Sequence, residues 1–301
     1  MKVERAAIFR TLDVFLMDRE SANLSEKSLR FYGQKITPFL KFLLARGITD
    51  VSEISPDDIR AFLVGLKGDH TPGGVHAFYR AIKAFCRWLY DEGKIPADVM
   101  RRIKAPKVPG ELLEPVPPVT VQALLQTCDL DAWIGARDYA LILMLLDTGL
   151  RASELLSVNV ADLDLESGKV LVRKTKGGKP RAAFVGETTR AALARYLGFK
   201  PLDYGSALRV AKAGTRLSYT GLRDIIRRRA KQAGVAAPSL HSFRRGFALT
   251  CLRSGMDIFS LQKLMGHSDL SVLRRYLAQT SEDLHLAHQH VGPVDHLTLC
   301  A

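Results

Sequence analysis

Residues 241–276 read HSFRRGFALTCLRSGMDIFSLQKLMGHSDLSVLRRY, and the spacing within this stretch organises the interpretation of the whole chain. Positions i and i+3 lie on the same face of a helix, so His241 and Arg244 are predicted to point toward one target. Apolar residues at spacings of four form an adjoining stripe that we expect to be buried, namely Phe243, Phe247 and Cys251. The predicted helix thus buries one face and offers the next to a ligand.

A second His follows a glycine in the same stretch, at Gly266-His267. The next two residues, Ser268-Asp269, are typical of a helix N-cap and predict a short helix that carries Tyr276. A Tyr on an apolar helical stripe is ordinarily a core aromatic, and a single HxxR pair has little specificity. A functional interpretation therefore depends on the rest of the chain.

Charge divides the chain into two unequal parts. The 301 residues carry a net charge of +13, of which residues 1–100 contribute +2 and residues 101–301 contribute +11. A strongly basic region is typical of a protein that binds a polyanion, most often nucleic acid. The alternative is a basic surface that is merely solvated.

Cysteine usage and hydropathy favour a soluble cytoplasmic protein with reduced thiols. The four cysteines are scattered and form no CxxC pair. The N-terminal segment lacks the apolar core of a signal peptide, and the longest fully apolar run, Tyr139–Leu146, is too short to span a bilayer.

Residues 1–95 predict a small bundle of four helices. Expected features are a helix at about 3–20, caps at Ser25, Ser55 and Thr71, a possible kink at Pro38, and a core stripe of Val75, Phe78, Ile82, Phe85 and Leu89. Residues 96–118 contain six of the 13 prolines and are predicted to be a semi-rigid linker. We expect a second domain at 119–280 and a tail at 281–301.

The second domain is predicted to be mainly helical with one β-hairpin. A cap at Thr120 precedes an apolar helix that ends at Gly149, and Arg151 follows at a turn behind this buried segment. The simplest structural role for Arg151 is a salt bridge to Glu154. The alternating run GKVLVRKTKGGKPRAAFV predicts an antiparallel hairpin that turns at Gly177-Gly178, and further helices are expected at about 187–197 and 219–234.

Basic side chains gather on the hairpin and on the helix near 219–234. Such residues either contact DNA phosphates or only keep an exposed surface soluble. The candidate DNA-binding residues are Lys174, Lys179 and Arg181 of the hairpin, Arg223 and Arg227 of that helix, and Arg245 of the stretch 241–276.

Five motifs in order make the chain similar to the tyrosine recombinase family, which includes phage integrases and Xer-like proteins. They are TGLRASEL, KTKGGKPR, HSFRRGFA, LMGHSDLS and the Tyr nine residues beyond that last His. The resemblance covers about 120–280 closely, and the helical N-terminal part looks like the family's core-binding domain. The implied fold is mainly α with a small antiparallel sheet, with a mixed α+β catalytic domain.

The resemblance also implies a role for each of six residues. Tyr276 would attack the scissile phosphate and form a 3′-phosphotyrosyl bond, and Lys176 would protonate the departing 5′-oxygen. The other four would hold or orient the phosphate: Arg151 and Arg244 at the non-bridging oxygens, with His241 and His267 assisting proton movement. Lys174 and Lys179 compete with Lys176 for the acid role, and Glu154 is expected to orient Arg151 or a His.

No cofactor is expected for this chemistry. A phosphotyrosyl ester conserves the energy of the broken bond, and the chain has no GxxxxGK[ST] phosphate loop. His285, His288 and His290 resemble metal ligands, but no carboxylate or Cys completes the set at suitable spacing.

The family resemblance implies a site-specific recombinase whose two domains clamp double-stranded DNA. Four protomers would exchange strands through a Holliday junction, with the protein monomeric before it binds DNA. Two alternatives remain: a type IB topoisomerase-like nicking and closing enzyme, and a catalytically inactive DNA-binding regulator.

Overall fold

A computed structural model of the chain describes most of both halves of the sequence. The described residues are 7–109, 114–173, 175, 180–200, 205–208, 211, 214–266 and 288–289. The chain divides into two compact units, Met1–Glu111 and Leu112–Ala301. Every helix among the described residues is either too short or too polar to span a lipid bilayer.

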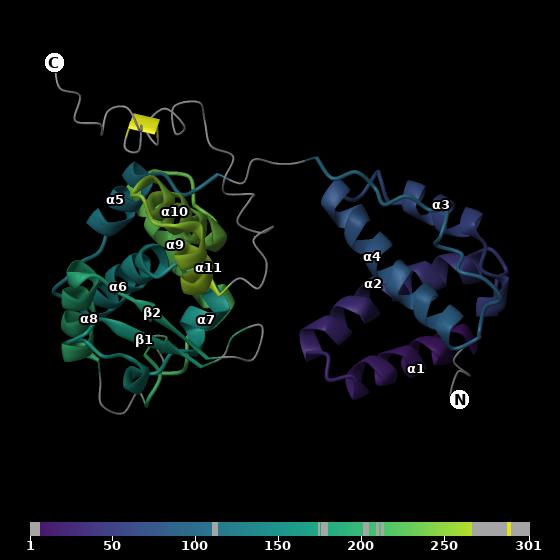
Figure 1. Cartoon of the computed structure of the whole chain (residues 1–301), viewed down its shortest axis with the longest axis horizontal. Coiled ribbons are helices and arrows are strands. Elements are labelled where there is room, and N and C mark those ends of the chain that lie inside the picture. The colour runs from purple at the N-terminus through teal and green to yellow at the C-terminus, as the bar shows by residue number, and fades with distance from the viewer. Residues whose placement is uncertain are drawn as a thin grey trace, which may run out of the picture. The chain divides into compact units, whose positions relative to one another are not determined.

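The first unit is the predicted helical bundle, drawn in purple and blue in Figure 1. Ser25, Ser55 and Thr71 each cap a helix by accepting a backbone N–H, as predicted. Its elements are α1 (Ala7–Ser21), α2 (Glu26–Ala45), the 3-10 turn η1 (Val51–Glu53), α3 (Pro56–Gly65) and α4 (Pro72–Asp91).

The predicted apolar stripe of α4 forms the centre of this unit. Its five residues are at most 4% exposed, so the prediction is confirmed. Phe85 of this stripe meets Phe15 of α1 edge to face, with ring centroids 5.3 Å apart.

Both ends of the proline-rich range are attached to a core. Met100 and Ile103 pack in the first unit, and the Tyr79 hydroxyl donates a hydrogen bond to the Ile103 carbonyl at 3.1 Å. Val116 packs in the second unit. The two units divide between Glu111 and Leu112, inside the range predicted as a linker.

The second unit consists of helices around one small sheet (Figure 1). Its elements are α5 (Pro118–Gln126), α6 (Trp133–Asp147), α7 (Ala152–Ser157), the 3-10 turn η2 (Val160–Asp162), β1 (Lys169–Val172), β2 (Arg181–Phe184), α8 (Glu187–Phe199), α9 (Tyr219–Ala233), α10 (Leu240–Arg253) and α11 (Ile258–Met265). The predicted cap at Thr120 is wrong, because α5 already begins at Pro118. A proline suits the first helical position, where its missing N–H needs no partner.

The predicted hairpin is confirmed in its two strands. β1 and β2 pair antiparallel, with Lys169 opposite Phe184 and Val172 opposite Arg181. Val170, Val172 and Ala183 turn into the core. The predicted turn at Gly177-Gly178 lies outside the described residues.

Residues 241–266 lie in α10, α11 and their junction. Ser239 caps α10 by accepting the Ser242 N–H, and Phe243 is fully buried. α11 packs against β2 and α10 and ends at Gly266, whose φ of +63° is a left-handed C-cap. The helix predicted to begin at Ser268-Asp269 lies outside the described residues.

Candidate active site

Arg244 lies in the interior of the second unit, although it carries a charge. It is 1% exposed, and its Nη1 and Nη2 donate hydrogen bonds to the carbonyl oxygens of Gly149 at 2.6 Å and Met265 at 2.8 Å. These bonds compensate the burial of the guanidinium. Arg244 therefore ties the turn before α7 to the C-terminal end of α11.

Gly149 allows α10 to approach this turn closely. It has a φ of +57°, and a Cβ there would lie 2.2 Å from Cδ1 of Phe247. A glycine is required both for the backbone angle and for the space. The contact fixes α10 beside the turn that carries Arg151.

Arg151 begins α7 and is held by Glu154 one turn later. The Arg151 backbone N–H donates to Glu154 Oε2 at 2.9 Å, and Arg151 Nη1 donates to Glu154 Oε1 at 2.8 Å. Arg151 Nη2 also lies 3.5 Å from the Gly266 carbonyl oxygen. The salt bridge and the orienting role expected for Glu154 are thus both present.

Arg181 of β2, in the hairpin, binds the same Glu154 carboxylate as Arg151. Its Nη2 donates to Glu154 Oε2 at 2.8 Å, and its Nη1 donates to the Leu264 carbonyl. The side chain is only 11% exposed. This guanidinium is directed into the protein, and the predicted contact of Arg181 with DNA stays a prediction.

Three guanidinium groups surround the buried carboxylate of Glu154, which is 2% exposed. The third, Arg244 Nη1, lies 3.9 Å from Glu154 Oε2. Burial acts to raise the pKa of Glu154, but the Arg151 hydrogen bonds and the charge of Arg181 outweigh it and hold the pKa below its ordinary value. With Glu154 ionised, the four side chains carry a net charge of about +2, which suits an anionic ligand.

His241 stands beside this cluster in the first turn of α10, with part of its ring open to solvent. Its partial burial, together with the charges of Arg245, Arg244 and Arg151, lowers its pKa below 6.5. The imidazole is therefore neutral at pH 7 and is able to accept a proton or a hydrogen bond.

Three of the six predicted catalytic residues, Arg151, His241 and Arg244, are gathered at one place. The others, Lys176, His267 and Tyr276, lie outside the described residues, as do Lys174 and Lys179 of the predicted DNA-binding set. Their roles stay predictions. His285 and His290 also lie outside the described part, so the absence of a metal site stays a prediction too.

The remaining predicted DNA-binding residues differ in their surroundings. Arg223 and Arg227 are exposed on α9. Arg245 is 9% exposed, and its Nε donates to the Glu114 carbonyl at 2.8 Å, so its contact with DNA stays a prediction. Arg229 of α9 instead binds the fully buried Asp138 of α6 at 2.7 Å. The density of basic residues in α9 did not distinguish this structural Arg from its exposed neighbours.

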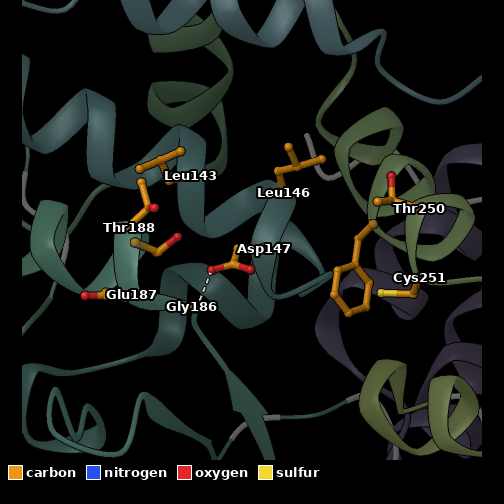
Figure 2. A pocket seen from close by; sticks show the side chains of 10 residues that line it. Leu143, Leu146, Asp147, Gly186, Glu187, Thr188, Thr250 and Cys251 are labelled. Carbon is orange, nitrogen blue, oxygen red and sulfur yellow. Dashed lines mark hydrogen bonds between the residues drawn. The ribbon is translucent and has the colours of Figure 1, made fainter. Parts of the chain in front are cut away.

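A separate pocket of about 400 Å³ lies between α6, the start of α8 and α10 (Figure 2). Leu143, Leu146 and Phe247 contribute apolar walls, and the Asp147 carboxylate accepts the Gly186 N–H at 2.7 Å. None of the predicted site residues lines it.

Two family models match this chain. The phage integrase family model matches residues 116–283, and the model for the SAM-like N-terminal domain of phage integrases matches residues 19–93. The first match spans the cluster around Glu154, and together the two cover most of both compact units. The chain belongs to the phage integrase family of tyrosine recombinases.

The chain is also similar to curated Xer proteins over nearly their full length. Tyrosine recombinase XerC of Roseiflexus castenholzii is 30% identical, covering 91% of this chain and 90% of the relative. Tyrosine recombinase XerD of Listeria monocytogenes is 28% identical, with 90% and 94% covered.

Solved structures show the same fold at lower identity. The Tn1549 transposon integrase in complex with circular intermediate DNA is 19% identical, with a TM-score of 0.76 over 93% of this chain and 98% of that one. XerH site-specific recombinase bound to a palindromic difH substrate is also 19% identical, with a TM-score of 0.71 over 92% and 82%.

Proposed function

We propose that this tyrosine recombinase, which breaks and rejoins DNA strands, does so by transesterification at a single backbone phosphorus. Tyr276 attacks the phosphorus and becomes joined to the 3′ end of the cleaved strand. Lys176 protonates the departing 5′-oxygen, because an ammonium is able to give up its proton. The 5′-hydroxyl of a second strand then attacks the phosphotyrosyl phosphorus, forms the new phosphodiester and releases the Tyr276 phenol, which completes the exchange.

The observation that carries this proposal is the convergence of Arg151 and Arg244. The two arginines come from different helices, yet both meet Glu154 and the last carbonyl groups of α11. A guanidinium binds two oxygens of a phosphate through its planar fork and stays charged at any physiological pH. The pair is thus suited to hold the two non-bridging oxygens, while His241 and His267 orient the same group.

The energetic requirement is of a size that these residues are able to meet. Ionising a Tyr with a pKa of about 10 at pH 7 costs about 4 kcal/mol. One well-placed donor stabilises a developing negative charge by about 3–4 kcal/mol in the transition state. Two arginines are therefore able to offset the free-energy cost of ionising the Tyr. The proposed reaction uses neither a nucleotide nor a metal ion.

The proposed partner is double-stranded DNA, bound by the chain as a tetramer that pairs two duplexes and exchanges strands through a Holliday junction. Two features support DNA as the partner: the net charge of +11 on residues 101–301 and the exposed Arg223 and Arg227 on α9. Among the structural relatives, a lambda integrase dimer was crystallised bound to a core site. We place this activity in the cytoplasm.

A nicked suicide duplex tests the proposal, because the short strand beyond the cleavage site is lost and the covalent complex accumulates. The wild-type protein is expected to form a DNA adduct that survives denaturation. Tyr276→Phe is expected to bind the duplex normally and to form none. A wild-type protein without any adduct would exclude strand transfer and leave a DNA-binding regulator.

A further inference from the structure

Arg181 is the one guanidinium of the cluster for which the proposed reaction gives no role. It lies on β2, opposite Val172 in the hairpin and five residues after Lys176. Its two terminal nitrogens bind Glu154 of α7 and the Leu264 carbonyl of α11. The residue thus joins three elements that each lie next to a predicted catalytic residue in the sequence. β2 follows Lys176, α7 follows Arg151, and α11 precedes His267.

Glu154 shares its two oxygens among three donors. Oε1 accepts the Arg151 Nη1, whereas Oε2 accepts the Arg151 backbone N–H and the Arg181 Nη2. Arg181 is therefore paired with the oxygen that does not bind the Arg151 side chain. Arg181 thus offsets the negative charge of Glu154 at the oxygen that the Arg151 guanidinium does not bind.

The charge balance explains why a third guanidinium is useful here. Arg151 and Arg244 with Glu154 alone have a net charge of about +1, which matches a phosphodiester in its ground state. With Arg181 included, the net charge is about +2. This matches the additional negative charge that the phosphate group carries in the transition state of Tyr attack. Charge that favours the transition state over the ground state accelerates the reaction.

The space for Arg181 is provided by Gly266. A Cβ at this glycine would lie 2.6 Å from Nε and 2.8 Å from Cδ of Arg181. The C-cap of α11 thus fulfils two requirements with one residue, a left-handed backbone and room for the arginine. The Arg181 side chain therefore packs against Gly266, the residue that precedes His267.

We propose that Arg181 is a positioning residue that acts through Glu154. It neutralises and holds this carboxylate so that Arg151 and Arg244 keep their charge directed at the phosphate. It does not contact DNA. The proposal rests on the strand-transfer function proposed above.

A double-mutant cycle tests whether Arg181 acts through Glu154. The measured quantity is the single-turnover rate of adduct formation on the nicked suicide duplex, with full-length protein in excess over DNA. Arg181→Gln is expected to slow this step about 30-fold, because the transition state loses part of its electrostatic stabilisation. In a Glu154→Gln background, the same substitution is expected to slow it less than about threefold, because no carboxylate remains to be neutralised.

Two further variants separate this role from a purely structural one. Arg181→Lys keeps the charge and is expected to stay within about fivefold of the wild-type rate. Arg195→Gln is the matched control, since Arg195 also bonds a carboxylate and a carbonyl, those of Asp131 and Leu130, outside the cluster. Its rate is expected to stay within about twofold, and DNA affinity is expected to be unchanged in the Arg181 and Arg195 variants.

Each other outcome contradicts a defined part of the account. An equal loss in both Glu154 backgrounds, or no loss in either, overturns the role assigned to Arg181, and so does a weakened affinity for DNA. Should Arg181→Gln fail to fold, a folded Arg181→Lys that loses more than about fivefold in rate overturns it. A wild-type protein that forms no adduct overturns the proposed function itself, and this proposal with it.

Discussion

At the scale of single residues, the site contains three arginines that are each held by specific hydrogen-bond partners. Arg244 is buried and bonded to two carbonyl groups, Arg151 is oriented by Glu154, and Arg181 offsets the Glu154 charge. Fixed donors of this kind require little reorganisation when charge develops on a substrate. The cluster is therefore organised for an anion before one binds.

The lowered pKa of His241 leads to a prediction for the free protein. Arg245→Gln is expected to raise this pKa, because it removes a positive charge that opposes protonation. An NMR titration of the imidazole Cε1–H signal measures the shift. Arg253→Gln, at the other end of α10, is the control and is expected to leave the pKa unchanged.

The sign of the pH effect on stability follows from the same shift. The folded-state pKa lies below the ordinary value of 6.5, so the unfolded chain takes up the proton first as the pH falls. Stability from His241 is then complete above pH 6.5 and is lost as the pH falls through the lowered pKa. A measured pKa at or above 6.5 in the wild-type protein would contradict this account.

At the scale of elements, the close approach of α10 to the turn before α7 brings the two arginines together. Gly149→Ala is expected to destabilise the protein by about 3 kcal/mol, because it combines a left-handed backbone with a clash against Phe247. Thermal or urea unfolding measures the change, and the adduct assay is expected to show a slower reaction.

Gly234→Ala serves as the matched control for this substitution. Gly234 has a similar φ of +68°, but nothing lies within 4 Å of a Cβ placed there. Its loss is expected to be about 1 kcal/mol, from backbone strain alone. Equal losses for the two variants would show that contact with Phe247 has no energetic weight.

The elements themselves were largely predictable from the sequence, because their signals are local. Ser25, Ser55 and Thr71 lie next to the helices they cap, and the α4 stripe repeats every three or four residues. Thr120 failed as a cap because a proline two residues earlier was an equally local and stronger helix start.

The direction of basic side chains was less predictable. Arg181 lies in a hairpin rich in Lys and Arg, which favoured a role in DNA binding. Its actual partners are Glu154, 27 residues earlier, and Leu264, 83 residues later. A single sequence carries no local signal for such contacts, so the catalytic motifs were identified only through their combined resemblance to a family.

At the scale of the whole molecule, charge is concentrated in the part that carries the arginine cluster. The exposed Arg223 and Arg227 on α9 are expected to contribute to binding through DNA phosphates. Replacement of both by Gln is expected to lower the slope of log K against log salt concentration by about 2, since each phosphate contact contributes about 0.9.

Fluorescence anisotropy with a labelled duplex at several salt concentrations measures this slope. Arg195→Gln provides the control, because Arg195 lies on α8 and bonds Leu130 and Asp131 in the turn before α6. A slope that stays unchanged in the double variant would remove α9 from the DNA-binding surface.

The central claim is that residues far apart in the chain act on one phosphorus, with Tyr276 as the attacking group. The most direct test is proteolysis of the trapped protein–DNA complex followed by mass spectrometry of the peptide that retains nucleotide. The account predicts that the nucleotide is attached to Tyr276 through a 3′-phosphate. Attachment at any other residue, or through a 5′-phosphate, would contradict it.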